Sequence, residues 1–384
     1  MWHRFLLTLS RQYLQTQVRR RPPRPLAGLD LAQVRRVLLI SATALGDTLF
    51  CTPALRALKE TYPHLSLEVL GHRVFGELLS HNPHIERVWR YPGRNRRLIA
   101  LARNLRRQGY DLVVILHGND PEATMLAHLT GSPYIIGSAG SPLSFVYSAS
   151  PGPYHPYEHA IERRLDYVRL LGADTRYKRM DLFLPPEAAR EAEAVLAGHF
   201  GTPPPLLLAL HPFGSSSYKS WPAENFAELG NHLFHTYGAS LVIISGGRDR
   251  AAAEALAARL AGPSLVTGGR FGLLTAAALL GRCRLLIAND SGPLHLGLAL
   301  AVPTMALLGP DHPARIGPYG ADWGTYLYKK EEVCAEEPCL TKKCPENLCL
   351  KAIQVAEVVE LLKTWWEPHY LGDRDQGSDG SEIT

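Results

Sequence analysis

Short apolar runs alternate with helical patterns in two successive series, and no other feature of the sequence constrains the fold as strongly. The first series opens at Arg35 with the run RRVLLIS, and Leu55, Leu58 and Tyr62 then recur at helix spacing. Strands that alternate with helices along a chain form parallel sheets covered by helices on both faces. The further strands predicted in this series are 65–70, 87–89, 112–116 and 134–137.

A second series of the same kind follows three consecutive prolines at 203–205. Its strands are predicted at 206–210, 240–245, 284–288 and 304–308. At roughly 100–200 residues per domain, 384 residues are expected to form two domains. The predicted organisation is a basic amphipathic extension at 1–34, one α/β domain at 35–190, a second at 200–366 and a disordered acidic tail at 367–384.

The N-terminal segment combines an apolar helical face with a dense group of arginines. The first 36 residues hold eight arginines and a single acid, Asp30. The apolar face consists of Trp2, Phe5, Leu6, Leu9 and Tyr13. This pattern favours a helix that lies on a membrane surface, and the alternative is a helix docked on the protein's own surface. No apolar run reaches the 18 residues or more that would span a bilayer.

A second group of eight arginines, again without any acid, lies between Arg87 and Arg107. Guanidinium groups in such density suit phosphates and anionic lipid headgroups, and the alternative is a solvated helix face. Neither group alternates with aromatic residues, and no nucleic-acid-binding motif follows. We therefore expect no nucleic-acid partner.

Polar loops follow the predicted strands, and ligands of parallel sheets bind where strands end. The first loop contains Gly46 and Asp47. The glycine allows a turn close to a ligand, and the carboxylate can act as a base. The alternative is that Asp47 caps the helix that follows. The loop matches neither GxGxxG nor a P-loop, so it does not predict a dinucleotide or ATP, and a dehydrogenase is disfavoured.

The second loop, 211–222, carries three serines and a lysine after a buried strand. Hydroxyl and amide groups at Ser215 and Ser216 can donate hydrogen bonds to phosphate oxygens, and Lys219 adds a positive charge. The alternative is a solvated serine-rich loop. We prefer an anion site, because such sheets bind ligands at this end of a strand.

The third loop has the most specific local pattern, NDSGPLHL from Asn289. Its proline suits the first turn of a helix, so the amides of Ser291 and Gly292 would lie at a helix N-terminus that can bind a diphosphate. Asp290 can accept hydrogen bonds from sugar hydroxyls, and His295 lies in the first turn. The alternative is a plain helix cap with an exposed histidine. A fourth loop, 309–315, is predicted to be a turn that lines the same cleft or is purely structural.

At these loops the chain resembles the lipopolysaccharide heptosyltransferases of glycosyltransferase family nine, over roughly 36–362. The resemblance includes ALGD followed by TPALRALK, HP-x-GSS-x-x-K-x-WP, and NDSGPLHL with VPT-x-ALLGP-x-x-PAR-x-GPYG after it. It implies an α/β fold of the GT-B type, in which two Rossmann-like domains with parallel sheets face each other. It also implies an inverting transfer from ADP-heptose to a lipid-linked oligosaccharide core, at the cytoplasmic surface of the inner membrane.

The same resemblance implies roles for individual residues. Asp47 takes the position of the base, and the donor is held by Ser215, Ser216, Lys219, Asp290, Ser291, Gly292 and His295. The one DxD of the sequence, Asp373 to Asp375, lies in the predicted tail, so no metal is expected at the reacting centre and no cofactor is expected. The rival function is a catalytically inactive nucleotide-sugar-binding module at the membrane.

Four cysteines recur every fifth residue near the C-terminus, at Cys334, Cys339, Cys344 and Cys349. Thiolates are good zinc ligands, but this spacing differs from the paired C-x-x-C of zinc ribbons. Disulfides are not expected in a cytoplasmic protein. A structural metal therefore stays an open alternative to a metal-free structural element.

Overall fold

The computed structural model describes residues 2–93, 97–118, 121–335, 339, 344 and 346–371, and it divides the chain into two compact units. Unit 1 consists of Met1–Ala189 and Ala314–Ala321, and unit 2 of Arg190–Pro313 and Asp322–Thr384. The segment Ala314–Ala321, here called the return segment, thus belongs to unit 1 although unit 2 precedes and follows it in the sequence. Nothing in the strand pattern predicts this return.

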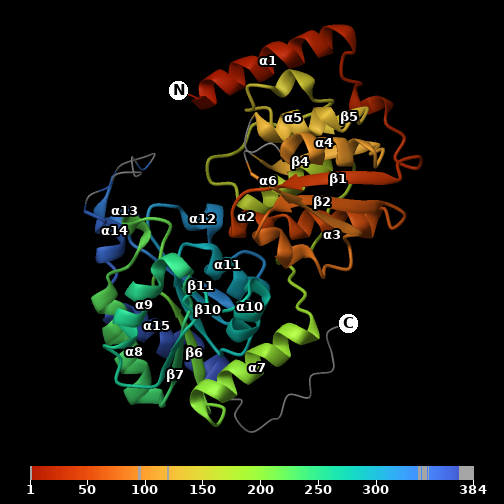
Figure 1. Cartoon of the computed structure of the whole chain (residues 1–384). Helices are drawn as coiled ribbons and strands as arrows, with labels where there is room; N and C mark the ends of the chain where they lie inside the picture. The colour runs from red at the N-terminus through yellow and green to blue at the C-terminus, as the bar shows by residue number, and fades with distance from the viewer. Residues whose placement is uncertain are drawn as a thin grey trace. The chain divides into compact units, whose positions relative to one another are not determined.

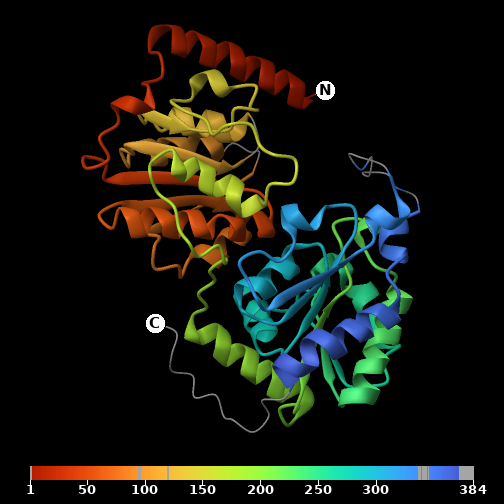
Figure 2. The same cartoon turned by 180° about the vertical axis from the view of Figure 1, so that it is seen from behind.

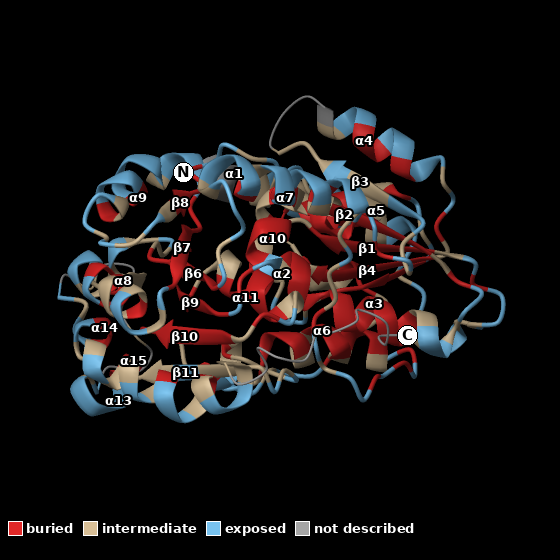
Figure 3. Cartoon of the chain, turned by 90° about the horizontal axis from the view of Figure 1, so that it is seen from below, coloured by how far each residue is buried: buried red, intermediate tan, exposed pale blue. Residues whose placement is uncertain are grey.

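Unit 1 contains one sheet of five parallel strands in the order β3-β2-β1-β4-β5. The strands are β1 (Arg36–Ser41), β2 (Ser66–His72), β3 (Arg87–Tyr91), β4 (Leu112–His117) and β5 (Tyr134–Ile136). The central strands β1 and β4 are almost wholly buried, as Figure 3 shows. Helices cover both faces of the sheet, which explains why these strands are continuous apolar runs without alternation.

The helices of unit 1 lie in layers above and below this sheet (Figures 1 and 2). They are α1 (Trp2–Arg20), α2 (Leu45–Phe50), α3 (Thr52–Thr61), α4 (Arg97–Arg106), α5 (Glu122–Leu129) and α6 (Ala160–Arg169). Helices α4 and α5 cover one face, and α1 lies beyond them on the same side. Helices α2, α3 and α6 pack together on the other face.

Unit 2 contains six parallel strands in the order β11-β10-β9-β6-β7-β8. They are β6 (Leu207–His211), β7 (Ser240–Ile243), β8 (Ser264–Val266), β9 (Leu286–Asn289), β10 (Thr304–Leu308) and β11 (Gly324–Tyr328). Sequence analysis missed β8 and β11, the two edge strands. One has only three residues and the other is largely half-exposed, so neither forms the continuous apolar run of a central strand.

The helices of unit 2 bury a large core against this sheet. They are α7 (Pro186–Phe200), α8 (Ala223–Tyr237), α9 (Arg250–Ala257), α10 (Leu273–Gly281), α11 (Gly292–Ala299), α13 (Lys330–Val333), α14 (Leu348–Lys351), α15 (Val355–Leu361) and the π-helix η6 (Leu362–Leu371). The short helix α12 (Pro313–Ile316) begins at the last residue before the return segment and otherwise belongs to it. One core cluster is centred on Trp221, Phe226 and Trp366, and it joins α8, α9, α15 and η6 to the sheet. Thr275 Oγ1 of α10 donates a 2.6 Å hydrogen bond to Glu191 of α7, which fixes α7 on the opposite side.

The N-terminal helix α1 docks on unit 1. Leu14 is fully buried, and Leu7 and Val18 pack against the same core as α4 and α5. The alternative of a helix docked on the protein's own surface is thereby confirmed for this inner face. The predicted apolar face points elsewhere, because Leu9 and Tyr13 remain 47% and 43% exposed. None of the described helices is long and apolar enough to cross a membrane.

The predicted disordered tail begins too early. Glu367 to Leu371 continue the last helix, where Tyr237 hydrogen-bonds to Glu367 and Arg284 Nη2 donates to the carbonyl of Tyr370 at 2.7 Å. These contacts to α8 and to the residues before β9 order the segment, and they involve partners far away in sequence. Residues 372–384, with Asp373 and Asp375, lie outside the described part of the chain.

The return segment is held on unit 1 through α6. His159 is the N-cap of α6 and accepts from Ile161 N through Nδ1, so its Nε2–H donates to the carbonyl of Gly317 at 3.1 Å. Its ring stacks on Tyr319 with centroids 4.4 Å apart, and Tyr319 Oη donates to Glu162 at 2.7 Å. Burial lowers the pKa of His159 to about 4, so this imidazole is neutral at physiological pH.

A buried carboxylate ties the strands of unit 1 together. Glu68 of β2 has a side chain only 1% exposed. It accepts hydrogen bonds from Arg36 of β1 at 2.5 Å, Trp89 of β3 at 2.6 Å and Tyr110 at 2.7 Å. Burial would raise the pKa of Glu68, but the bonds from Tyr110, Trp89 and Arg36 outweigh it and lower the pKa. Glu68 is therefore a charged structural residue.

Replacing Glu68 by alanine is expected to lower the free energy of unfolding by about 3 kcal/mol, because three donors lose their acceptor and the Arg36 charge loses its counterion. Urea unfolding followed by Trp fluorescence measures the change. The matched control is Glu86→Ala, an exposed glutamate directly before β3, which should change stability by less than about 0.5 kcal/mol. Equal losses in the two variants would contradict the role of Glu68.

Candidate active site

The strand order of unit 1 reverses between β1 and β4, and Asp47 lies at that point. Chain connections leave β1 toward one edge of the sheet and β4 toward the other, and such a reversal opens a crevice at the carboxyl ends of the strands. β1 ends at Ser41 and leads into α2, whereas its neighbour β4 ends at His117. Asp47 is the third residue of α2, and the N-cap is Ala44, which makes no side-chain cap. The Asp47 carboxylate also has a backbone hydrogen bond at Ala44, so a helix-cap contact of Asp47 exists beside its other contacts.

Three side chains surround the Asp47 carboxylate. Thr43 Oγ1 donates to Oδ2 at 2.9 Å, Arg164 Nη2 of α6 donates to Oδ1 at 2.7 Å, and His117 Nε2 lies 3.7 Å from Oδ1. His117 Nδ1 also lies 2.7 Å from Thr43 Oγ1. Thr43 has one proton, which it gives to Asp47, so His117 Nδ1–H donates to Thr43 in the neutral form. The result is a chain of hydrogen bonds from His117 through Thr43 to Asp47.

The environment keeps Asp47 ionised. Burial alone would raise its pKa, but His117, Arg164, the Thr43 hydroxyl and a backbone hydrogen bond at Ala44 together lower it. The pKa of His117 is lowered as well, by burial first and then by the Arg164 charge, with Asp47 opposing. At neutral pH the site therefore holds a carboxylate beside a neutral imidazole, which is a suitable pair for taking up a proton.

A polar pocket of about 270 Å³ adjoins this group. His117 and Arg164, both partners of Asp47, also line the pocket, together with Arg163 of α6. Hydroxyl groups complete its wall, from Ser138, Ser141, Tyr147, Tyr154 and Tyr167. A pocket lined by so many hydrogen-bonding groups suits a hydroxyl-rich ligand.

The sheet of unit 2 reverses its order in the same way, between β6 and β9. The loops after three neighbouring strands, β6, β9 and β10, supply Lys219, Asp290 and Asp311. Lys219 Nζ donates to Asp290 at 2.8 Å and to Asp311 at 2.5 Å. Sequence analysis predicted Lys219 and Asp290 as site residues, but it predicted only a turn at Asp311.

The charges of this cluster depend on one another. Burial would lower the pKa of Lys219, but Asp290 and Asp311 outweigh it and raise the pKa, so the ammonium is charged. Burial raises the pKa of Asp290, and the Asp311 carboxylate adds to that effect, whereas Lys219 opposes it. One ammonium group thus holds two carboxylates together at the end of the sheet.

The serine-rich loop folds tightly beside Lys219. A Cβ at Gly214 would lie 2.4 Å from the carbonyl oxygen of Lys219, so only glycine fits there. Lys219 ends the short 3₁₀ helix η4 (Ser217–Lys219), and Ser216 is its N-cap. Ser216 Oγ is buried and has no hydrogen-bond partner among the described residues, whereas Ser215 is exposed. A buried hydroxyl without a partner is the feature expected of a ligand-binding loop.

The third predicted loop leads into α11. Ser291 is the N-cap in extended conformation, its hydroxyl donates back to Asn289 O at 3.3 Å, and it makes no side-chain cap. Gly292 is the first helical residue, and His295 is buried in the first turn at 4% exposure. The first N–H groups of α11 are thus left without a side-chain cap, as in helix ends that bind phosphate.

Comparison with known proteins identifies the family. Residues 98–349 match the family model described as glycosyltransferase family 9 (heptosyltransferase). The chain belongs to glycosyltransferase family 9. It is 27% identical to lipopolysaccharide heptosyltransferase 1 of Pseudomonas aeruginosa, over 80% of this chain and 87% of the relative. It is 26% identical to lipopolysaccharide heptosyltransferase 1 of Salmonella typhimurium, over 74% of this chain and 92% of that one.

Solved structures show that the fold is shared. The family 9 glycosyltransferase of Veillonella parvula superposes with a TM-score of 0.75 at 24% identity, covering 86% of this chain and 96% of that one. Escherichia coli heptosyltransferase WaaC, solved with ADP, gives a TM-score of 0.62 at 22% identity, over 85% of this chain and 97% of that one. The same enzyme was also solved with ADP-2-deoxy-2-fluoro heptose. The GT-B fold class and the family resemblance predicted from the sequence are confirmed, and the chain is a glycosyltransferase.

The structure places the predicted site residues of this family 9 enzyme in two groups. Asp47 lies in unit 1. The seven predicted donor-binding residues lie in unit 2, in the segments that follow the carboxyl ends of its strands β6 and β9. Sequence analysis missed Thr43, His117 and Arg164. His117 occupies the last position of β4, next to the predicted strand 112–116, so its strand-end position was a usable signal. Arg164 lies inside α6, where nothing local distinguishes it.

The four clustered cysteines line a small cavity of about 40 Å³ together with Tyr218, Lys330 and Asn347. Within the residues that the structure describes, no group of three or more Cys, His, Asp or Glu is arranged to hold a metal ion. Parts of the intervening loop, 336–338, 340–343 and 345, are not among those residues. The structural metal therefore stays a prediction without support from the described residues.

Removing the Lys219 charge is expected to make stability depend on pH. In Lys219→Met, Asp290 loses the group that opposes the raised pKa, so this carboxyl binds a proton more readily in the folded than in the unfolded state. A carboxyl whose pKa is raised in the folded state destabilises that state little at low pH. The destabilisation grows as pH rises through the pKa of the carboxyl in the folded state. The loss in unfolding free energy should be about 3 kcal/mol at pH 8 and clearly smaller at pH 5.

Thermal unfolding at the two pH values, always relative to the wild type, measures this difference. The control is Lys351→Met, which removes an exposed lysine of the same unit at α14. It should show no difference between the pH values. A Lys219→Met penalty that is equal at pH 5 and pH 8 would contradict the proposed charge balance.

Proposed function

We propose that this family 9 glycosyltransferase transfers a heptose from ADP-heptose to a lipopolysaccharide core or similar lipid-linked acceptor, with inversion and without a metal at the reacting centre. The named relatives are lipopolysaccharide heptosyltransferases, and WaaC was solved with ADP and with a fluorinated ADP-heptose. The observation that carries the proposal is the ionised Asp47 carboxylate beside a hydroxyl-lined pocket, at the reversal of a doubly wound sheet.

In the proposed reaction, Asp47 is the general base. An acceptor hydroxyl in the pocket of unit 1 attacks the anomeric carbon of the donor, and its proton passes to Asp47. The bond from the anomeric carbon to the diphosphate breaks, and the leaving ADP takes the electron pair. Attack from the side opposite the leaving group inverts the anomeric configuration. Arg164 and Thr43 position the carboxylate, and the neutral His117 keeps the hydrogen-bond chain polarised toward it.

Unit 2 is the proposed donor-binding unit, and unit 1 the acceptor-binding unit. The uncapped N-terminus of α11 at Ser291 and Gly292 is the proposed diphosphate site, and Ser216 offers a buried hydroxyl that has no partner among the described residues. Ser215 and His295 are proposed to complete this contact. Lys219 stabilises the charge that grows on the leaving diphosphate, a task that metal ions perform in other enzymes. Asp290 holds Lys219 in place and accepts hydrogen bonds from the sugar hydroxyls.

The enzyme is proposed to work at the cytoplasmic surface of the inner membrane, where a lipid-linked acceptor would be found. The exposed Leu9 and Tyr13 on α1 and the arginines that follow support this location. The catalytically inactive binding module has no observation in its favour. Asp47 is ionised and positioned by three partners, whereas a binding module needs no such base.

The substitution Asp47→Asn is expected to lower the rate of transfer by roughly 10²–10⁴-fold, because an amide cannot accept the proton. The measurement is ADP release from ADP-heptose in the presence of a core acceptor, with the product identified by its mass. ADP affinity, measured by calorimetry, should stay within about twofold, since the proposed donor site lies in unit 2. The control Glu60→Gln removes an exposed carboxylate from α3 of the same unit. Transfer near the wild-type rate in Asp47→Asn would refute the base assignment.

The substitution Arg164→Met removes a cation that lowers the pKa of Asp47. The pKa of Asp47 should rise, and a base is lost by protonation as pH falls through its pKa. The acid limb of the profile of kcat/KM against pH should therefore move to higher pH than in the wild type. Arg73→Met, which removes an exposed arginine of unit 1, should leave the profile in place. An unmoved or acid-shifted limb in Arg164→Met would show that Arg164 does not act through Asp47.

A further inference from the structure

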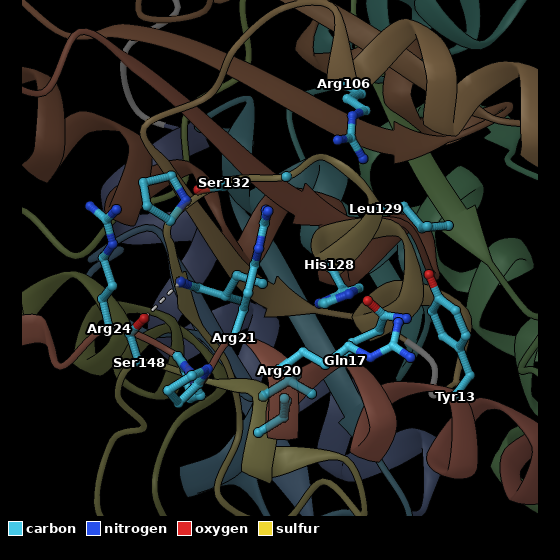
Figure 4. Close-up of a pocket in the computed structure, with 17 residues that line it drawn as sticks. Tyr13, Gln17, Arg20, Arg21, Arg24, Arg106, His128, Leu129, Ser132 and Ser148 are labelled. Atoms are coloured by element: carbon cyan, nitrogen blue, oxygen red, sulfur yellow. Dashed lines mark hydrogen bonds between the residues drawn. The ribbon is translucent and has the colours of Figure 1, made fainter.

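Unit 1 contains a second and larger cavity, of about 530 Å³, that none of the proposed catalytic residues lines. It lies where the end of α1 and the following linker meet α5 and the residues around β5 (Figure 4). Its apolar floor includes Val18, Leu129, Ile135 and Val146. The family match begins at residue 98, so one wall of this cavity, formed by α1 and its linker, lies outside the matched region.

Four arginines line the cavity: Arg20, Arg21, Arg24 and Arg106. Arg20 ends α1, Arg21 and Arg24 lie in the linker that follows, and Arg106 ends α4, so the fold brings together charges that are far apart in sequence. No acidic residue is among the described residues that line it. Throughout the described part of the chain, none of these four guanidinium groups pairs with a carboxylate. Four like charges around one cavity repel one another, and a bound anion relieves that repulsion.

Neutral hydrogen-bonding groups stand between the arginines. Gln17 and Tyr13 of α1, His128 of α5 and Ser132 reach the same space, as Figure 4 shows. Burial and the Arg106 charge lower the pKa of His128, so its imidazole is neutral and does not add to the repulsion. Guanidinium forks together with hydroxyl and amide donors match the oxygens of a phosphate group.

The outer face of α1 carries exposed apolar side chains beside the cavity, and these indicate what kind of molecule would carry the phosphate. Leu9 and Tyr13 are spaced by four residues, so they share one face of the helix, and both are exposed at 47% and 43%. Tyr13 also lines the cavity, so the exposed apolar face runs directly into its mouth. An apolar surface beside a cationic cavity is complementary to an amphiphile, with acyl chains next to its anionic headgroup.

We propose that this cavity binds the phosphate group of an anionic membrane lipid, with the outer face of α1 lying against the lipid surface. The inference rests on the membrane location proposed above and gives it a defined headgroup site. It does not depend on the transfer chemistry, because no proposed catalytic residue contributes to the cavity.

The test is binding of the full-length protein to sedimented vesicles of phosphatidylcholine with and without phosphatidylglycerol. The wild type should bind the anionic vesicles and not the neutral ones. The variant Arg21→Gln/Arg106→Gln should bind them roughly 25-fold more weakly, at about fivefold for each basic residue removed near the surface. Arg21 and Arg106 are both exposed, so this variant should fold with the wild-type Tm.

The matched control is Arg103→Gln/Arg107→Gln, which removes two exposed arginines at the same end of α4 that do not line the cavity. It has the same net charge as the cavity variant and should lose much less affinity. Equal losses in the two variants would overturn the proposal, because binding would then follow net charge alone. Saturation of the cavity by millimolar inorganic phosphate, seen as an Arg106-dependent rise in Tm without vesicle binding, would overturn the lipid as its source.

Activity on a water-soluble, deacylated core acceptor separates this proposal from the proposed function. The cavity variant should keep the wild-type rate within about twofold on that acceptor. If the wild type shows no transfer but cavity-dependent vesicle binding, the proposed function fails and the lipid site stands. If transfer is normal and vesicle binding is absent, the lipid site fails and the proposed function stands.

Discussion

The architecture of both units depends on one topological constraint, the reversal of strand order in a parallel sheet. Successive crossover connections run outward in opposite directions from β1 and β4, and again from β6 and β9. The helices that follow these neighbouring strands therefore leave on opposite faces, and the ends of the strands stay open to a ligand. Asp47 with His117 occupies one such end, and Lys219 with Asp290 occupies the other. The two polar groups are thus consequences of chain winding, and side-chain chemistry then distinguishes them.

The two groups use charge in different ways. In unit 1 a single carboxylate accepts from a guanidinium and a hydroxyl, so it is held ionised and in one orientation. In unit 2 the ammonium group of Lys219 donates hydrogen bonds to two carboxylates. Asp290 and Asp311 together hold Lys219 in position. A base that takes up a proton needs the first arrangement. A cation that meets a diphosphate benefits from the second, because it is already oriented before the ligand arrives.

The local sequence pattern was sufficient to predict most central strands and the loops that follow them. Buried parallel strands are apolar runs, and polar residues mark where each run ends. It failed where position depends on distant partners. Arg164 is one arginine among several in α6 and becomes a partner of Asp47 only when the helix packs on the sheet. The face by which α1 docks, through Leu14, was missed because the exposed face is at least as apolar. The edge strands β8 and β11 lack the apolar continuity on which such predictions rely.

The return segment has a consequence for how the protein forms during translation. Unit 1 needs Gly317 and Tyr319 for the contacts of His159 and Glu162, yet the ribosome makes most of unit 2 before it reaches them. Unit 1 emerges first, and the surface of α6 around His159 and Glu162 therefore lacks these contacts while most of unit 2 is being synthesised. A fragment cut at Ala189 would carry the same gap permanently. The two units have separate cores, but unit 1 can form its last contacts only after most of unit 2 has been synthesised.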